Sequence, residues 1–252
     1  MIHFIGAGPG APDLITVRGA RLIAQADVII YAGSLVNPAL LEGKKQGCLV
    51  YDSASMTLEQ VLEVMRRTEA AGGDTVRLHT GDPALYGAIR EQMDELDELG
   101  IPYDVTPGVS AFSGAAAALN AEYTLPQVSQ SVIITRMAGR TPVPEGEALR
   151  KMAGHGCTLV LFLSTGLLEQ VERELLAGGA YGPDTPAAIV YKATWPEQKI
   201  FRCTVSTLAQ TARDNHITKT ALITVGDFLG DKYERSKLYD PAFAHGYREA
   251  SK

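Results

Sequence analysis

Residues 77–92 read RLHTGDPALYGAIREQ, and they join a short apolar strand to an amphipathic segment through a glycine turn. We predict a strand over 74–79 and a helix over 84–99. Asp82 would cap this helix and Pro83 would lie in its first turn, because aspartate and proline favour those positions. The same turn follows a predicted parallel strand, where ligands often bind. A capping role and a binding role are compatible with each other.

Strand and helix signals alternate along the 252 residues, which favours the α/β class. The strands of the first half are short and apolar on both faces, as expected for a buried, largely parallel sheet. In this half we predict strands over 2–6, 27–31, 48–51, 74–79 and 102–106 and helices over 13–25, 57–71, 84–99 and 110–120.

The second half has a different pattern. The runs at 186–192 and 199–203 are separated by a short polar stretch, which predicts an antiparallel hairpin within a mixed sheet. Residues 122–126 have the composition of a domain junction. We therefore expect two α/β domains, residues 1–125 with a mostly parallel sheet and residues 126–252 with a mixed one. The other elements predicted here are strands over 131–136, 157–163 and 220–226 and helices over 145–153, 165–177 and 205–214.

Composition narrows the function classes. The net charge of −6 argues against nucleic acid as the main partner. No apolar run approaches the roughly 20 residues that a membrane helix needs, and the start of the chain lacks the features of a signal peptide. Cys48, Cys157 and Cys203 are scattered and read as reduced thiols rather than as a zinc site or disulfides. We expect a cytoplasmic protein that does not use a membrane.

Three glycine turns follow predicted strands. Residues 6–11 read GAGPGA and match the dinucleotide pattern G-x-G-x-x-A. Pro9 removes a backbone N–H that a pyrophosphate would need, and the next strand ends at Tyr31 with no acidic residue for a ribose. An NAD-binding domain is therefore disfavoured. The turns after residues 5, 79 and 106 should instead meet at one edge of the sheet and form a small-molecule site.

The sequences of these turns resemble those of a known protein family. GAGPG at 6–10, GDP at 81–83 and PGVSA at 107–111 resemble the tetrapyrrole (corrin/porphyrin) methylase family over nearly the whole chain. Narrower motifs resemble the members that methylate C11 of precorrin-4 in cobalamin biosynthesis. Those motifs are YAGSL at 31–35, LPQVSQ at 125–130, ITR at 134–136, KATWP at 192–196 and LYDP at 238–241.

The resemblance implies two α/β domains with S-adenosylmethionine in the cleft between them, S-adenosylhomocysteine as the product, and a homodimer. It implies cofactor contacts at Pro9, Thr80, Gly81, Asp82, Leu85, Ser110, Ala111, Leu163, Ala193 and Ala221. Leu163 departs from the methionine of some relatives, a change that nearly conserves volume.

Methyl transfer from a sulfonium needs alignment more than an acid or a base. We expect no catalytic triad and no metal, and no pattern identifies a catalytic residue. Asp82 could accept a proton, but holding the cofactor is the better interpretation. The tetrapyrrole carries many carboxylates, which call for focused cations. We assign this role to Arg136 and Lys192. Weaker candidates are Arg18, Arg77, His79 and Arg140, and for every one of these side chains the alternative is a solvated surface charge.

Several alternatives stay open. Trp195 could stack on the macrocycle or pack within the protein. The ring substrate could be metal-free or contain cobalt, and residues 81–87 lean toward cobalt. A methylase of the same family acting at another ring carbon, a methylase of RNA or protein, an NAD-dependent oxidoreductase and a non-catalytic tetrapyrrole binder are the competing functions.

Overall fold

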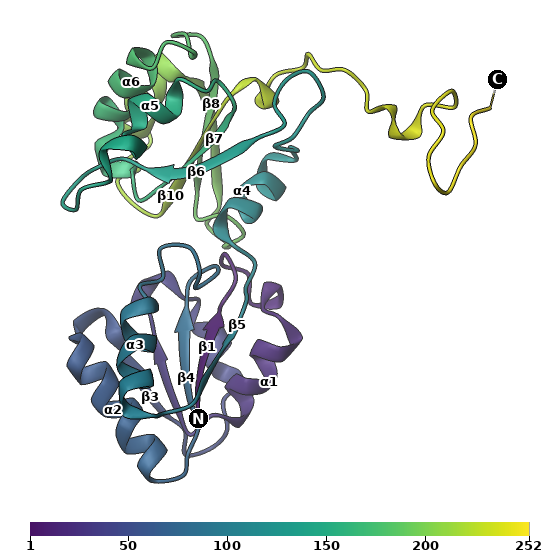
Figure 1. Cartoon of the computed structure of the whole chain (residues 1–252). Helices are drawn as coiled ribbons and strands as arrows, with labels where there is room; N and C mark the ends of the chain where they lie inside the picture. Colours follow the sequence, from purple (N-terminus) through teal and green to yellow (C-terminus); the bar gives the residue numbers. More distant parts are fainter. Residues whose placement is uncertain (252) are drawn as a thin grey trace. The chain divides into compact units, whose positions relative to one another are not determined.

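A computed structural model describes residues 1–251, without the side chain of Tyr239. The chain forms two compact units, both drawn in Figure 1. Unit 1 consists of Met1–Ala115 together with Lys192–Gln198, and unit 2 consists of Ala116–Tyr191 together with the chain from Lys199 onward. The predicted domain limit between residues 125 and 126 stays a prediction.

Unit 1 is built on a five-stranded sheet in which every strand pair is parallel. The order is β3(Leu49–Asp52), β2(Val28–Tyr31), β4(Thr75–His79), β1(Ile2–Gly6) and β5(Tyr103–Thr106). The helices are α1(Val17–Gln25), α2(Leu58–Ala70) and α3(Arg90–Leu99). This confirms the predicted parallel sheet.

The central strands β1 and β4 of unit 1 are buried along their whole length, as expected for the middle of a parallel sheet, although β4 also contains polar residues. Ile5, Ile29 and Leu78 pack in one apolar cluster with Ile23 of α1. Phe4 and Ile30 pack in a second cluster on the opposite face with Met65 of α2 and Leu96 of α3. Helices therefore cover the sheet from both sides, and the strand ends are left for binding.

The boundaries of the helices follow from local chemistry. The Thr16 hydroxyl accepts a hydrogen bond from the Gly19 amide at 3.0 Å and caps α1. Thr57 and Gln60 form a reciprocal capping box at the start of α2. Gly100, with φ of 66°, ends α3 in the left-handed conformation that glycine adopts without cost.

The predicted helix over 84–99 is wrong in its first turns. The helix α3 begins only at Arg90, so neither Asp82 nor Pro83 starts it. Tyr86 and Ala88 have φ values of 58° and 50°, which no right-handed helix contains. Gly87 lies so close to the Pro83 carbonyl that a Cβ would be 2.1 Å from the oxygen. Residues 82–89 are therefore a tight loop.

Unit 2 contains a mixed five-stranded sheet. Its order is β6(Val132–Arg136), β7(Thr158–Phe162), β10(Ala221–Val225), β8(Pro186–Tyr191) and β9(Lys199–Thr204). Strands β6 and β7 are parallel, and the other three pairs are antiparallel. The predicted hairpin is confirmed as β8 and β9.

The remaining helices are α4(Ala111–Leu119), α5(Leu149–Ala153), α6(Leu168–Ala177) and α7(Leu208–Asp214). The division between the units falls within α4. The 3₁₀ turns are η1(Pro12–Leu14), η2(Gly33–Leu35), η3(Pro38–Gly43), η4(Ser53–Ser55), η5(Glu145–Glu147), η6(Thr165–Leu167), η7(Val205–Thr207), η8(Asp227–Leu229) and η9(Lys237–Tyr239).

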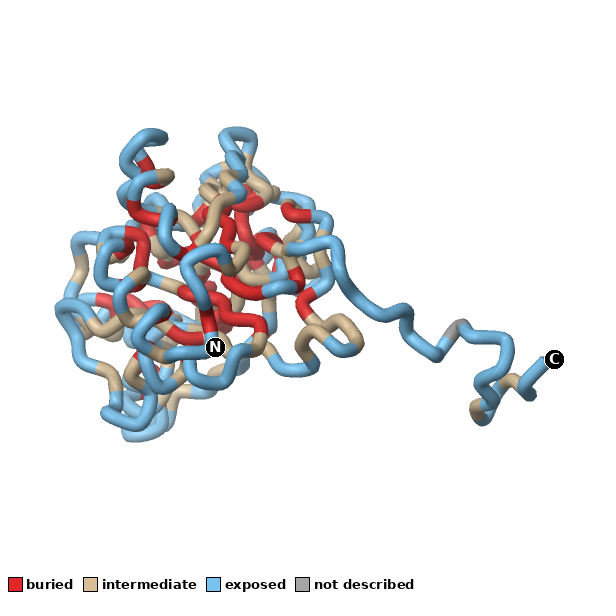
Figure 2. The backbone as a smooth tube through the Cα atoms, turned by 90° about the horizontal axis from the view of Figure 1, so that it is seen from above, coloured by how far each residue is buried: buried red, intermediate tan, exposed pale blue. Residues whose placement is uncertain are grey.

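Three further observations bear on the sequence-based expectations. Cys48, Cys157 and Cys203 are free thiols of intermediate burial. Within residues 1–251, no helix is long and apolar enough to cross a bilayer. The segment after Gly230 is mostly exposed, as the pale blue tube in Figure 2 shows.

Candidate functional site

The three predicted glycine turns meet at the carboxyl edge of the parallel sheet in unit 1, as expected, and a small-molecule site there stays a prediction. Directly after β1 and β4, Gly8 and Gly81 exchange two backbone hydrogen bonds of 3.2 and 2.8 Å. The Ala7 amide donates to the His79 carbonyl at 2.7 Å. Gly108, which follows β5, lies against both other turns.

Close backbone packing explains why two of these positions are glycine. A Cβ on Gly6 would lie 2.5 Å from the Gly108 Cα, and a Cβ on Gly108 would lie 2.2 Å from the Gly81 oxygen. Both distances are too short for real carbon contacts, so a side chain at either position would push the turns apart. The glycines therefore set the geometry of the edge whether or not a ligand is bound.

Asp82 joins two of the turns. One carboxylate oxygen accepts from the Ala84 amide at 2.8 Å, and the other accepts from the Gly108 amide at 2.9 Å. A carboxylate holding two backbone N–H groups is a strong, oriented link. Asp82 thus has a structural task in fixing the turns after β4 and β5, and a contact with a cofactor remains a prediction.

Eight of the ten residues that the resemblance assigns to the cofactor belong to unit 1, and those of the three turns lie at this edge. Ser110 and Ala111 follow the turn after β5, and the Ala111 nitrogen would be 3.3 Å from a Cβ on Gly81. Pro9 borders the small-residue helix α4, because a Cβ on Gly114 would be 2.8 Å from the Pro9 side chain. Thr80 and Leu85 lie in the turn and the loop after β4.

The segment Lys192–Gln198 connects β8 to β9 but packs within unit 1. The Trp195 indole N–H donates to the Pro9 carbonyl at 3.0 Å, and the Ala11 amide donates to the Thr194 hydroxyl at 3.0 Å. The indole also covers Gly10, where a Cβ would be 2.1 Å from the ring. Trp195 therefore packs within unit 1, and its stacking on a macrocycle stays a prediction. The same segment carries Ala193.

Lys192 is engaged within the same segment. Its Nζ lies 5.1 Å from the centre of the Trp195 ring and 3.6 Å from a carboxylate oxygen of Glu197. The amino group is thus held beside the Pro9 turn rather than swinging freely in solvent. Binding of a substrate carboxylate by Lys192 stays a prediction.

In unit 2, Leu163 stands out. It follows β7 with φ of 51°, a conformation that is rare for a bulky residue, and its side chain is 69% exposed. The next two residues are held by hydrogen bonds. The Ser164 hydroxyl accepts from the Met137 amide, and the Thr165 hydroxyl donates to the Ala221 carbonyl. A strained, exposed leucine on a rigid support is typical of a binding residue.

Positive φ values recur beside the predicted cofactor residues. Lys192 and Thr194, with φ of 45° and 68°, flank Ala193 on both sides, and Thr220, with φ of 58°, precedes Ala221. Such backbone conformations cost free energy and persist where the surrounding structure enforces them, often at binding sites. Strain was not visible in the sequence, because the residues involved are ordinary ones.

The predicted substrate cations have different environments. The Arg136 guanidinium donates to the carbonyls of Met137, Thr141 and Pro142, at 3.4, 3.2 and 2.6 Å, and so closes the loop after β6. Arg18 and Arg140 are exposed. Contact of Arg136 with the substrate stays a prediction.

Two of the weaker candidates for binding substrate carboxylates, Arg77 and His79, are wrong. The side chains of Arg77 and His79 lie inside unit 1, where the residues are only 7% and 4% exposed. Arg77 donates to the Ile30 carbonyl and to the Gln92 side chain instead. Burial, together with the Arg77 charge, lowers the pKa of His79 to about 3, so this histidine is neutral at physiological pH.

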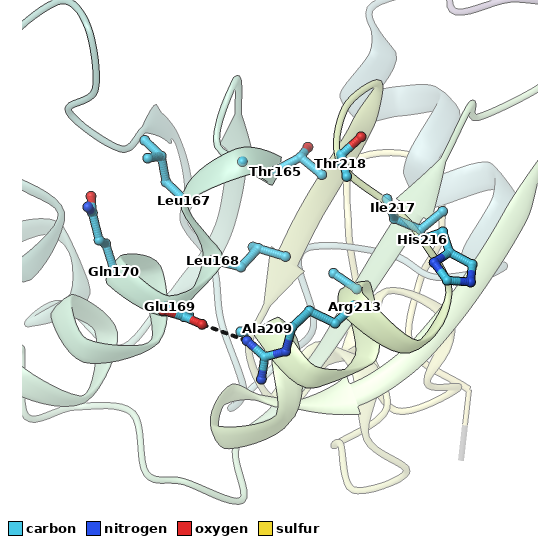
Figure 3. A pocket seen from close by; sticks show the side chains of 12 residues that line it. Thr165, Leu167, Leu168, Glu169, Gln170, Ala209, Arg213, His216, Ile217 and Thr218 are labelled. Carbon is cyan, nitrogen blue, oxygen red and sulfur yellow. Dashed lines mark hydrogen bonds and ion pairs between the residues drawn. The ribbon is translucent and has the colours of Figure 1, made fainter.

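A hollow in unit 2 lies between α6 and α7 (Figure 3). Arg213 and Glu169 form an ion pair of 2.6 Å there, drawn as the dashed line in Figure 3. Leu168 and Ile217 supply apolar lining. None of the residues predicted from the sequence lines this hollow. Elsewhere too, no group of three or more His, Cys, Asp or Glu side chains within residues 1–251 could hold a metal ion.

The comparisons agree with this arrangement. The profile of the Tetrapyrrole (Corrin/Porphyrin) Methylases matches residues 1–209. The chain belongs to this family.

Among its relatives, the cobalt-precorrin-4 C(11)-methyltransferase of Methanocaldococcus jannaschii is 51% identical over 100% of this chain and 97% of its own length. The precorrin-4 C(11)-methyltransferase of Pseudomonas aeruginosa is 47% identical over 98% of both chains.

Two solved structures extend the comparison. An X-ray structure of a cobalt precorrin-4 methyltransferase, a cobalamin biosynthetic enzyme, has a TM-score of 0.89 and 48% identity over 91% of this chain and 96% of that chain. The uroporphyrin-III C-methyltransferase of Thermus thermophilus complexed with S-adenosyl homocysteine has a TM-score of 0.73 and 26% identity, over 90% of this chain and 92% of that chain. The predicted family and the two-domain α/β fold are thus confirmed.

Proposed function

We propose that this chain transfers a methyl group from S-adenosylmethionine to C11 of precorrin-4 or cobalt-precorrin-4 in cobalamin biosynthesis. The observation that carries the proposal is the convergence of the three glycine turns and the segment Lys192–Gln198 at one sheet edge. The relatives with identities of 47–51% over the full length support the ring position.

The residues present suit S-adenosylmethionine. Ser110 is a buried polar residue at the edge, and the ends of the parallel strands present backbone groups there. The exposed Leu163 offers an apolar surface for the adenine or the methionine chain. The relative complexed with S-adenosyl homocysteine supports the choice of this cofactor. The proposed contacts are Pro9, Thr80, Gly81, Asp82, Leu85, Ser110, Ala111 and Ala193 of unit 1 and Leu163 and Ala221 of unit 2.

The bound cofactor supplies a methyl group already activated by the positive charge of its sulfonium. The residues of the chain then have to bind, orient and exclude water, and alignment alone is worth roughly 7–11 kcal/mol. The rigid connections made by Asp82 and Trp195 suit this task, because a misplacement of about 1 Å costs rate steeply. No residue needs to act as a nucleophile.

The substrate carries several carboxylates, whereas the chain has a net charge of −6. Binding therefore depends on local cations. We assign Lys192 and Arg136 to this role: Lys192 is held beside the Pro9 turn, and Arg136 is held at the end of β6. Each is already braced by the protein, so little side-chain entropy is lost when a carboxylate arrives.

We also propose that the protein acts as a cytoplasmic homodimer. The family resemblance implies the dimer, and three free thiols without a disulfide suit a reducing compartment. Light scattering after size-exclusion chromatography measures the mass directly. A mass near twice the 27.0 kDa of the chain is expected, and a monomer at micromolar concentration would contradict the dimer.

Calorimetric titration with S-adenosylhomocysteine tests the cofactor assignment. We expect micromolar binding to the wild type and none with NAD under the same conditions. The Gly43→Ala variant is titrated as a control and should bind S-adenosylhomocysteine as the wild type does, since the added Cβ would meet nothing within 4 Å. Binding of NAD in place of S-adenosylhomocysteine would overturn the proposal.

A further inference from the structure

The loop over residues 82–89 is held in an unfavourable backbone conformation. Tyr86 and Ala88 are both left-handed, although neither is glycine. This loop contains Asp82 and Leu85, two of the proposed cofactor contacts. Strain of this kind persists only where surrounding groups enforce it.

A buried side chain provides that enforcement. Gln92, in the first turn of α3, is 5% exposed, and its Nε2 donates to the Ala88 carbonyl at 2.9 Å. Its Oε1 accepts from the Nε of Arg77 at 3.2 Å. The amide therefore connects the end of the loop to β4, the strand from which the loop departs.

The chemistry of Arg77 fixes the direction of this connection. A guanidinium has donors only, so Gln92 must present its oxygen to Arg77 and its NH₂ group to Ala88. A second Arg77 nitrogen donates to the Ile30 carbonyl of β2 at 3.2 Å. Burial lowers the pKa of Arg77 to about 10, which still leaves it charged at neutral pH. Within residues 1–251, Arg77 forms no ion pair with a carboxylate.

We propose that Arg77 and Gln92 are positioning residues of the methylase site. Arg77 orients the Gln92 amide, the amide holds the Ala88 carbonyl, and the loop over 82–89 is thereby fixed in the shape that receives the cofactor. This proposal rests on the proposed function for the identity of that cofactor. Neither side chain contacts a ligand, because both are inside unit 1 beneath the loop.

A single substitution separates the two halves of this connection. In Gln92→Glu, the carboxylate still accepts from Arg77 and forms an ion pair with it, but it has no N–H for Ala88. The fold keeps its link between α3 and β4, and only the loop is released. Met65→Ala is the matched control, because Met65 packs from α2 in the apolar cluster that contains Leu96 of α3 and forms none of these hydrogen bonds.

Three measurements on the full-length protein decide the matter: hydrogen exchange of the amides over 84–91, calorimetric affinity for S-adenosylhomocysteine, and the midpoint of thermal unfolding. For Gln92→Glu we expect faster exchange in the loop and a dissociation constant roughly tenfold higher, with the unfolding midpoint close to that of the wild type. For Met65→Ala we expect a lower midpoint with wild-type exchange in the loop and wild-type affinity.

Unchanged loop exchange in Gln92→Glu would overturn the proposal, and so would a faster-exchanging loop that binds the ligand with wild-type affinity. An equal loss of affinity in Met65→Ala would also overturn it, since general destabilisation would then explain the effect. Failure of the wild type to bind S-adenosylhomocysteine would count against the proposed function instead. The exchange measurement would still report whether Gln92 holds the loop.

Discussion

The indole N–H of Trp195 donates a hydrogen bond of 3.0 Å to the carbonyl of Pro9, across 186 residues of sequence. Pro9 belongs to the first glycine turn, and Trp195 belongs to the connection between β8 and β9. The pairing brings Ala193 beside the turn that follows β1. It also explains Gly10, because any side chain there would collide with the indole.

Trp195→Phe tests this pairing. Phenylalanine keeps a ring over Gly10 but cannot donate to Pro9, so we expect a loss of about 1 kcal/mol of stability and weaker binding of S-adenosylhomocysteine. Tyr181→Phe is a matched control, since it removes a hydroxyl that donates to the Cys157 carbonyl in unit 2. The control should lose similar stability in urea unfolding and keep its affinity. If Trp195→Phe bound S-adenosylhomocysteine as tightly as Tyr181→Phe does, the hydrogen bond of Trp195 would not contribute to the binding site.

Gly108→Ala should be strongly destabilising. The added Cβ would lie 2.2 Å from the Gly81 oxygen, and overpacking of this kind costs about 1–3 kcal/mol or more. Gly43→Ala has open space around its Cβ and should be neutral or slightly stabilising. Urea unfolding of both variants provides the comparison. Equal stability of the two would show that the turns can separate without cost.

His79 predicts a dependence of stability on pH. Burial and Arg77 lower its pKa from 6.5 to about 3 in the folded protein. Below pH 6.5 the unfolded chain binds a proton at His79 that the folded chain does not bind. The stability that neutral His79 contributes to the folded state is therefore present above pH 6.5 and is lost as the pH falls towards 3. Between pH 7 and pH 5 the loss should be about 2 kcal/mol.

His79→Leu removes this dependence. Its unfolding free energy should fall less than that of the wild type between pH 7 and pH 5, by the same 2 kcal/mol. The comparison of the two proteins cancels the carboxylates that they share. Parallel pH profiles would mean that the imidazole is protonated in the folded state, contrary to its burial.

Leu163→Asn should separate stability from binding. The side chain is 69% exposed, and asparagine tolerates the left-handed backbone better than leucine does, so stability should be unchanged or higher. Affinity for S-adenosylhomocysteine should fall several-fold if Leu163 contacts the cofactor. Leu49→Asn, at an exposed leucine of β3, controls for lost apolar surface. An unchanged affinity of Leu163→Asn would remove this residue from the site.

Local patterns were sufficient for the parallel sheet, the hairpin of β8 and β9, and the meeting of the glycine turns at one edge. These features depend on apolar periodicity and on turn residues close in sequence. The start of α3 at Arg90 was not predictable in this way, because contact between Gly87 and the Pro83 carbonyl competes with helix propensity. The positions of Arg77 and Trp195 depend on partners 15 and 186 residues away.

Charge was the least reliable guide to function. Arg77 and His79 look like surface cations in the sequence, yet Gln92 of α3 and the Ile30 carbonyl of β2 receive the hydrogen bonds of Arg77 inside the unit. The alternation of β4 indicates only that Thr75, Arg77 and His79 share one face of the sheet. The sequence pattern did not show that this face is covered, and the structure buries all three residues.

The central claim is methylation at C11, and transfer of an isotopic label tests it most directly. The purified protein would be incubated with S-adenosylmethionine carrying a ¹³C-labelled methyl group and with precorrin-4 or cobalt-precorrin-4 in separate reactions. The account predicts a product with one labelled methyl, located at C11 by NMR, from at least one of the two substrates. A labelled methyl at another ring carbon, or no transfer to either substrate by a protein that binds S-adenosylhomocysteine, would contradict it.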